Sequence, residues 1–124
     1  MRVTRQRRAI LESLRSSGRP LLPQEVLDIA REDVPELGLA TVYRAIRALE
    51  EQEEIVAIHL PGEAPRYELQ EVAARHHHHF RCERCDRVFD LPGCADGLRS
   101  LLPPGFELHR HDIVLYGLCD ECAS

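Results

Sequence analysis

Apolar residues recur at helical spacing in three segments of the first half of the chain. Within residues 4–16, 23–32 and 40–52 they return every three or four positions, which places them on one face of an α-helix. Glycine and proline residues lie between the segments and favour turns there. The pattern therefore predicts three short helices, each with one buried face.

Two runs rich in β-forming residues follow the third segment. Residues 54–60 and 65–70 flank the turn-forming pair Pro61-Gly62, which is typical of a β-hairpin. Three short helices followed by a hairpin fit a winged helix-turn-helix, whose third helix enters the major groove of DNA. The polar face of that helix carries four residues suited to contacts with bases or phosphates, namely Thr41, Tyr43, Arg44 and Arg47.

The second half of the chain predicts a small α/β domain. The expected elements are three strands and one short helix, at residues 76–81, 87–91, 106–118 and 94–102 respectively. We therefore expect an α+β chain with a DNA-binding domain over residues 1–70, a hinge over residues 71–75 and the α/β domain over residues 76–124.

Positive charge is concentrated at the start of the chain. The 124 residues have a formal net charge of −5, which argues against nonspecific binding of the whole chain to polyanions. Residues 1–19, however, hold six arginines and a single acidic residue, Glu12. We expect the arginines at the start of the first helix, Arg5 and Arg7 among them, to contact DNA phosphates.

No stretch of about 18 apolar residues occurs, and no signal-peptide pattern is visible. We therefore expect a cytoplasmic protein that does not span a membrane.

Two Cys-x-x-Cys pairs are the strongest chemical signal in the sequence. Cys82 and Cys85 form one pair, and Cys119 and Cys122 form the other. Two intervening residues let both thiolates of a turn face one ion, and two such turns supply the four thiolates of a structural zinc site. Two disulfides or two redox pairs are the alternatives, but disulfides need an oxidising compartment. Cys94 has no partner in this scheme, and we expect it to be a buried or idle thiol.

Four consecutive histidines precede the first cysteine pair. On a strand, side chains alternate between faces, so His77 and His79 would share one face and His76 and His78 the other. Imidazole is a preferred ligand of borderline divalent metals. The run therefore suggests two further metal sites, each completed by residues from elsewhere in the chain.

In combination, these motifs resemble those of the ferric uptake regulator family of bacterial metal-sensing repressors. The resemblance covers nearly the whole chain and is carried by TRQRRAIL (4–11), GLATVYRAIRAL (38–49), RYEL (66–69), HHHHFRCERC (76–85), VFD (88–90) and LYGLCDEC (115–122). It implies a winged-helix domain, an α/β dimerisation domain, and homodimers that bind palindromic double-stranded operators when loaded with metal. It implies no small-molecule substrate.

The resemblance also implies roles for individual residues. Cys82, Cys85, Cys119 and Cys122 match the family's structural zinc site. His77 and His79 match its regulatory site, with Glu71 and His59 as the nearest candidates for further ligands. The implied third site comprises His76, His78, Asp96 and His111. Asp90 matches an aspartate that some peroxide-sensing members use.

The chain departs from the iron- and peroxide-sensing members in two places. Those members usually have a histidine just before the second helix, where this sequence has Arg19 and Pro20. The four-histidine run is also more similar to that of zinc uptake regulators. We therefore expect a zinc-sensing repressor whose regulatory ion is Zn²⁺, with Fe²⁺ or Mn²⁺ and iron, manganese or peroxide sensing as the alternatives.

Two other classes of protein would also explain part of the sequence. A zinc hydrolase would use an open site to activate water, but no HExxH or similar helix motif occurs, so we do not expect an enzyme. A metal buffer without a DNA role would explain the histidines and cysteines, but not Thr41, Tyr43, Arg44 and Arg47. Metal-dependent, salt-sensitive binding to a palindromic duplex would separate a repressor from a buffer.

Overall fold

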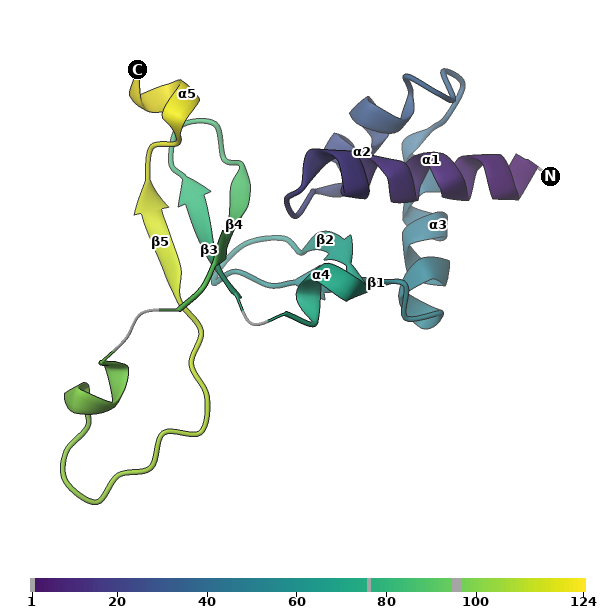
Figure 1. Cartoon of the computed structure of the whole chain (residues 1–124). Coiled ribbons are helices and arrows are strands. Elements are labelled where there is room, and N and C mark those ends of the chain that lie inside the picture. Colours follow the sequence, from purple (N-terminus) through teal and green to yellow (C-terminus); the bar gives the residue numbers. More distant parts are fainter. Residues whose placement is uncertain (1, 76, 95–96) are drawn as a thin grey trace.

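The first half of the chain folds into three helices and a hairpin, and the second half into a separate sheet (Figure 1). The structure, a computed structural model, describes residues 2–75, 77–94 and 97–124, without the side chains of residues 2–4 and 77. The elements of the first half are α1 (Arg2–Ser17), α2 (Pro23–Ala30), α3 (Leu39–Glu51), β1 (Ile55–Ile58) and β2 (Arg66–Leu69). The predicted α+β class and the predicted order of these elements are confirmed.

The apolar faces of the three helices form the main core. Ile10 of α1, Val26 of α2 and Val42 of α3 are fully buried, and apolar residues of β1 and β2 close the core from below the helices. Helix α2 begins with Pro23, which suits a first turn because the amide there needs no helical acceptor. The Leu22 amide donates to Glu25 Oε1 at 2.9 Å and fixes that helix end.

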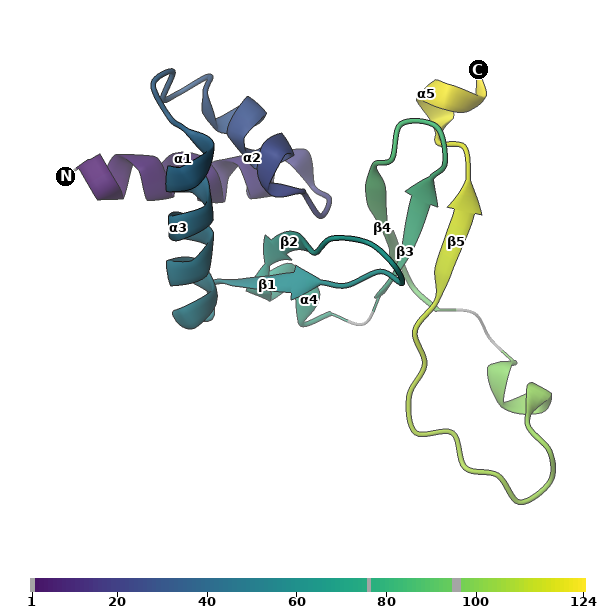
Figure 2. The same ribbon diagram turned by 180° about the vertical axis from the view of Figure 1, so that it is seen from behind.

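The β1–β2 hairpin joins the helices to the second half, as both views show (Figures 1 and 2). Its strands are antiparallel, with Ile55 opposite Leu69. The Leu21 amide donates to the Tyr67 carbonyl at 2.9 Å, and the Tyr67 amide donates back at 2.8 Å, so the α1–α2 connection pairs with β2. As a result every residue of β2 is buried, on both faces of the strand.

The second half is built around one central strand. Its elements are α4 (Gln70–Ala73), β3 (His77–Cys82), β4 (Val88–Pro92), the 3₁₀-helix η1 (Leu98–Leu101), β5 (Val114–Gly117) and α5 (Asp120–Ala123). Strand β3 lies between β4, which is antiparallel to it, and β5, which is parallel to it. A parallel pair needs a long crossover, and the segment from Gly93 to Ile113 provides it.

One prediction for the second half was wrong. The strand expected over residues 106–118 is confined to 114–117, and residues 106–113 are mostly polar and belong to no strand. The segment expected as a hinge, residues 71–75, overlaps α4, which packs against β1 and β2, and its role as a hinge stays a prediction. None of the helices in the described ranges is both long enough and apolar enough to cross a bilayer.

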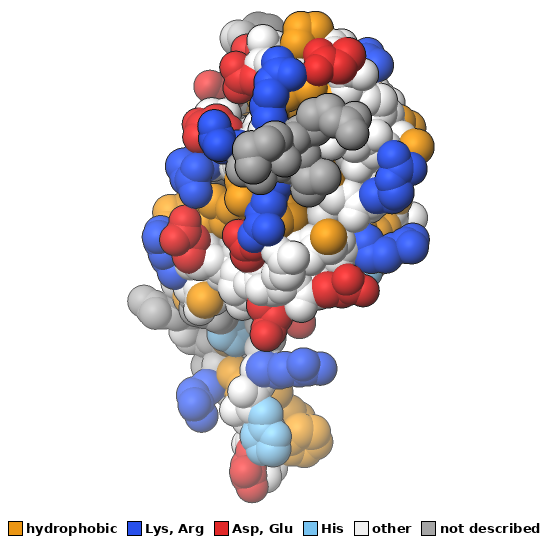
Figure 3. All heavy atoms as spheres, turned by 90° about the vertical axis from the view of Figure 1, so that its right-hand side faces the viewer, with side chains coloured by type: hydrophobic (Ala, Val, Ile, Leu, Met, Phe, Trp, Pro, Cys, Tyr) orange, Lys and Arg blue, Asp and Glu red, His pale blue; other side chains and the backbone are white. Residues whose placement is uncertain are grey.

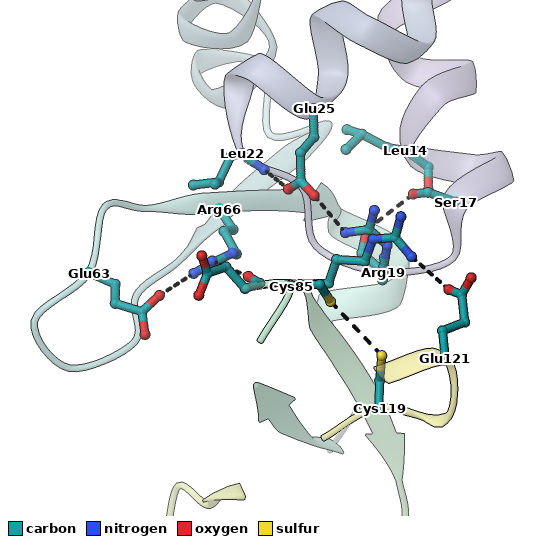
Figure 4. Close-up of polar contacts among 12 residues, drawn as sticks. Leu14, Ser17, Arg19, Leu22, Glu25, Glu63, Arg66, Cys85, Cys119 and Glu121 are labelled. Carbon is teal, nitrogen blue, oxygen red and sulfur yellow. Dashed lines mark hydrogen bonds and ion pairs between the residues drawn. The ribbon is translucent and has the colours of Figure 1, made fainter. Parts of the chain in front are cut away.

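An inter-half ion cluster links the β1–β2 loop to the β3–β4 turn through Glu63, Arg66, Arg81 and Asp86. Arg66 Nη1 donates to Glu63 Oε1 at 2.7 Å (Figure 4), and Arg81 Nε lies 2.5 Å from Glu63 Oε2. Arg66 Nη2 donates to the Asp86 carbonyl at 2.7 Å, and Arg81 Nη2 donates to the Asp86 carboxylate at 2.9 Å. Burial pushes the pKa of Glu63 upward, but hydrogen bonds from Arg66 and Arg81 hold the pKa below its ordinary value of 4.5.

Replacing Glu63 with glutamine should lower the free energy of unfolding by about 2–3 kcal/mol. The Arg66 guanidinium, whose side chain is 3% exposed, would lose its counter-charge. The loss stays below the roughly 3–5 kcal/mol typical of a fully buried pair, because Glu63 is 21% exposed. Urea unfolding would measure the change. Glu107→Gln is the control, since Glu107 and its partner His109 are largely exposed. Equal losses in the two variants would contradict a role for the cluster.

Candidate metal centres and nucleic-acid interface

The two Cys-x-x-Cys pairs meet in space, as their spacing predicts. Donor atoms of Cys82, Cys85, Cys119 and Cys122 all lie within 4.8 Å of one another. Cys82 ends β3 and Cys85 lies in the following turn, while Cys119 and Cys122 come from the end of the chain around α5. Cys85 Sγ lies 3.9 Å from Cys119 Sγ (Figure 4). All five cysteines, each within the described ranges, are thiols rather than disulfides.

The thiols of this cluster differ in acidity. The amides of Cys85 and Cys119 donate to Cys82 Sγ at 3.5 Å and 3.4 Å, and these bonds lower the pKa of Cys82 to about 6. Burial and the neighbouring thiols raise the pKa of Cys122 to about 12. Four thiolates this close repel one another, and a divalent cation would remove that repulsion. The donor set therefore fits a closed tetrahedral zinc site.

Glu68, His79 and Asp90 form a second cluster at the junction of the two halves. Glu68 lies on β2, His79 on β3 and Asp90 on β4, with donor atoms within 4.8 Å of one another. His79 Nε2 lies 3.3 Å from Asp90 Oδ1. Burial, followed by the negative charge of Asp90, raises the pKa of Glu68 to about 8. Two crowded carboxylates beside an imidazole are a donor set that a divalent cation would stabilise.

Glu68, and not the expected Glu71, belongs to this cluster of potential ligands, and the assignment of Glu71 as a ligand stays a prediction. Glu71 lies on α4 and is exposed, whereas the pairing of β2 on both sides holds Glu68 inside, where it is 3% exposed. His59 lines a cleft of about 560 Å³ together with His79, but it does not belong to the cluster. The His77 side chain lies outside the described part of the structure, so its assignment as a ligand stays a prediction.

Arg19 lies beside this cluster. Its Nη1 donates to Glu25 Oε2 at 3.0 Å (Figure 4), and its guanidinium carbon lies 6.0 Å from the centre of the Phe89 ring. Arg19, Glu68 and Asp90 help to line one pocket of about 130 Å³. A guanidinium has no lone pair to offer a cation, so Arg19 cannot supply the ligand that a histidine would supply at this point.

The raised pKa of Glu68 predicts that the stability of the protein depends on pH when the second cluster holds no ion. The folded chain keeps Glu68 protonated up to about pH 8, whereas the unfolded chain loses this proton near pH 4.5. The free energy of unfolding should therefore fall by a few kcal/mol as the pH rises from about 4.5 to about 8, and then level off.

Thermal melts at several pH values would test this. Protein stripped of exchangeable metal should lose much of the slope in the Glu68→Gln variant, which stays neutral at every pH. Glu71→Gln is the matched control, because Glu71 lines the same pocket but is exposed. The same slope in wild type and Glu68→Gln would refute the prediction.

His78, Cys94 and His111 form a third cluster. Their donor atoms also lie within 4.8 Å of one another. Neighbouring histidines of β3 thus join different clusters, as the alternation of side chains along a strand predicts. Of the residues expected here, His78 and His111 are present, whereas His76 and Asp96 lie outside the described residues. Cys94, which we expected to be a buried or idle thiol, instead contacts both histidines.

The residues of α3 predicted to contact DNA lie on its outer face. Val42, Ile46 and Leu49 are buried on the opposite face of the helix, while Tyr43 is 52% exposed. Arg44 and Arg47 are also exposed, and Arg44 Nη2 donates to Thr41 Oγ1 at 3.1 Å. A cavity of about 420 Å³ between α1 and α3 is lined partly by Arg7, Thr41 and Arg44. These features suit a helix that presents donors to a groove of DNA.

Arg5 and Arg7 are already paired with acidic residues. Arg5 donates to Glu36 Oε2 at 3.0 Å and to the Asp33 carbonyl at 2.8 Å, and Arg7 pairs with Glu54. Figure 3 shows arginine and acidic side chains interspersed over this helical face. Such exposed pairs contribute only about 0–1 kcal/mol, so a DNA phosphate can take the place of the carboxylate.

Comparisons with known proteins agree with this geometry. Residues 1–116 match the ferric uptake regulator family. The chain is 30% identical to the ferric uptake regulation protein of Campylobacter jejuni over an alignment of 127 residues, which covers 98% of this chain and 80% of that protein.

Two solved structures have the same fold. The Helicobacter pylori ferric uptake regulator, described as having three functional metal binding sites, matches with a TM-score of 0.64 and 25% identity, over 96% of this chain and 80% of that one. FurB from M. tuberculosis, described as a zinc uptake regulator, matches with a TM-score of 0.52 and 26% identity, over 98% of this chain and 95% of that one.

Proposed function

This chain belongs to the ferric uptake regulator family of metal-responsive DNA-binding regulators, and on that premise we propose that it is a zinc-sensing repressor of metal uptake genes. In this proposal it binds palindromic operators as a metal-loaded homodimer. The four-cysteine cluster holds a structural Zn²⁺, and the Glu68–His79–Asp90 cluster holds the regulatory ion. His77 and His59 remain further candidates for ligands of the regulatory ion.

The position of Glu68, His79 and Asp90 is the observation that carries the proposal. Glu68 belongs to the hairpin of the helical half, whereas His79 and Asp90 belong to the sheet of the second half. Without a cation, burial and the negative charge of Asp90 keep Glu68 protonated up to about pH 8. When Glu68, His79 and Asp90 share an ion, the ion takes the place of that proton and the two halves are held in one relative orientation.

That orientation matters because a dimer must place two recognition helices about one DNA turn apart. A change that favours the DNA-competent orientation by about 1–3 kcal/mol would tighten operator binding roughly 5–150-fold. By linkage, operator DNA must tighten binding of the regulatory ion by the same factor. Thr41, Tyr43, Arg44 and Arg47 would contact the operator, and Arg5 and Arg7 would exchange their acidic partners for phosphates.

The apolar surface of the second half supports dimerisation. Strand β5 lies at an edge of its sheet, and Leu115, Tyr116 and Leu118 are each more than two-fifths exposed, at 51%, 49% and 43%. An exposed apolar edge strand of this kind is suited to pairing with a second copy of the chain.

Zinc is favoured by the residues near the regulatory cluster. The chain has Arg19 and Pro20 where the iron- and peroxide-sensing members usually have a histidine, and its sequence contains four consecutive histidines at residues 76–79. The similarity to a structure described as a zinc uptake regulator points the same way. Iron, manganese or peroxide sensing is the alternative, because Asp90 and Glu68 supply oxygen donors that Fe²⁺ and Mn²⁺ also accept.

Operator binding at buffered metal concentrations tests the proposal. Duplexes would first be selected from a random pool with zinc-loaded protein, and their affinity then measured against buffered Zn²⁺, Fe²⁺ and Mn²⁺, with bound metal counted per chain. We expect Zn²⁺ to raise the affinity roughly 5–150-fold. Equal affinity for chelator-treated and zinc-replete protein would exclude metal control, and a larger response to Fe²⁺ or Mn²⁺ would favour the alternative.

A further inference from the structure

The third cluster contains a thiol where the sequence led us to expect a carboxylate. Cys94 Sγ lies 2.9 Å from His111 Nε2 and 3.4 Å from His78 Nε2. The three residues come from separate segments: His78 from β3, Cys94 from the chain after β4, and His111 from the chain before β5. The crossover between β4 and β5 carries Cys94 near its start and His111 near its end. Both donors lie beside His78 of the neighbouring strand β3.

The two histidines of this cluster differ in exposure and orientation. The His78 ring is 5% exposed, and its Nδ1 accepts a hydrogen bond from the Ile113 amide at 3.2 Å. The His111 ring is more accessible, and its centroid lies 5.0 Å from that of His78. Cys94 is exposed to solvent. One anchored imidazole, one accessible imidazole and one accessible thiol form a site that an ion in solution can enter.

We propose that Cys94 is a metal ligand, and that His78, Cys94 and His111 bind a soft or borderline divalent ion of the zinc class through two nitrogens and one sulfur. Thiolate donors favour such ions, whereas Mn²⁺ prefers oxygen donors. Cys94 would therefore give this site a metal preference that a carboxylate in its place would not give. The importance of this site for repression rests on the proposed function, but the binding of the ion does not.

Binding of an ion at this site would change the hydrogen bond that the Ile113 amide donates to His78 Nδ1. An Nδ1 that accepts from an amide leaves the ring proton on Nε2, the atom that faces Cys94. Coordination through Nε2 requires the other tautomer, in which Nδ1 carries the proton and the Ile113 amide loses this acceptor. Ile113 immediately precedes β5, so occupancy of the site should change the hydrogen bonding at the start of that strand.

Cobalt(II) provides a direct probe of the proposed sulfur ligand. The experiment uses full-length protein that retains zinc in the four-cysteine cluster and has been stripped of exchangeable metal. A Co²⁺ titration should produce a thiolate-to-cobalt charge-transfer band, because the only thiol outside the zinc-filled cluster is Cys94. The Cys94→Ser variant should lose the band and bind one fewer Co²⁺ per chain. His79→Ala should keep the band, because the second cluster has no thiol.

A second measurement uses the reactivity of the thiol. In the same protein a thiol reagent should label about one cysteine per chain; Zn²⁺ should protect that cysteine and an equal concentration of Mn²⁺ should not. Amide exchange at Ile113 should also change when Zn²⁺ binds. An unchanged cobalt band in Cys94→Ser, or labelling of Cys94 that Zn²⁺ does not slow, would overturn the proposal.

These results can be separated from those for the proposed function. Operator binding that ignores metal, with the cobalt band intact, would refute the repressor and leave the thiolate site standing. Metal-dependent operator binding without the cobalt band would support the repressor and refute the thiolate site.

Discussion

The Cys82→Ser variant is expected to lose its tightly bound zinc and the folded structure of the second half. Cys82 is fully buried, and its sulfur accepts two amide hydrogen bonds within the four-thiol cluster. The cluster ties the β3–β4 turn to the chain around α5, across a sheet whose strands are only four to six residues long. Structural zinc contributes roughly 10–16 kcal/mol in small zinc domains, which is more than such a sheet supplies alone.

Three measurements would check this result. On protein stripped of exchangeable metal, metal counting should find one fewer zinc per chain, circular dichroism should show loss of the strand signal, and sedimentation should show loss of the dimer. Cys94→Ser is the matched control, because Cys94 lies outside the four-thiol cluster and its replacement should leave the structural zinc in place. A Cys82→Ser protein that folds and dimerises without tightly bound zinc would show that the cluster does not hold the domain together.

The His79→Ala variant is expected to keep the structural zinc and lose the metal-dependent gain in operator affinity. His79 is the only nitrogen donor in the second cluster of the described chain, between the carboxylates of Glu68 and Asp90. Its loss would leave two carboxylates from strands of different halves without the imidazole that completes the donor set. The expected change is the whole metal response, roughly 5–150-fold in affinity, with metal-free binding little altered.

Titration of a selected duplex with and without Zn²⁺ would measure the response of His79→Ala. His59→Ala is the matched control, since His59 lines the same cleft but lies outside the cluster. We expect this control to keep most of the response. A His59→Ala variant that loses the response as completely as His79→Ala would return His59 to the ligand set. An undiminished response in His79→Ala would remove this cluster as the sensing site.

The parts of the fold that the sequence predicts well are those encoded over short stretches. The helical spacing of apolar residues is enough to predict that Ile10, Val26 and Val42 face the core, and the structure buries these residues as expected. Spacing likewise brings Cys82 close to Cys85 and Cys119 close to Cys122 through single turns of chain. The placement of His78 and His79 in different clusters follows from the alternation of side chains along a single strand.

The sequence does not reveal those contacts that depend on how distant segments pack. Glu68 becomes a cluster member because β2 pairs with the α1–α2 connection on one side and β1 on the other, which local spacing does not reveal. Cys94 lies beside His111 because the two ends of the long crossover between β4 and β5 come together, which local spacing does not reveal either. A signal for Glu68 was present, however: it is a charged residue within RYEL, a short run that the sequence already predicted to be a strand.

Strand β3 contributes one residue to each of the three clusters: His78, His79 and Cys82. With Cys82 held in the four-thiol cluster, deleting or inserting a single residue between His79 and Cys82 would move both histidines to the opposite faces of the strand and send each toward the other cluster's partners. A length change in the crossover, around Phe106, would leave that alternation untouched. We therefore expect natural relatives to vary in length within the crossover and to keep β3 free of insertions and deletions.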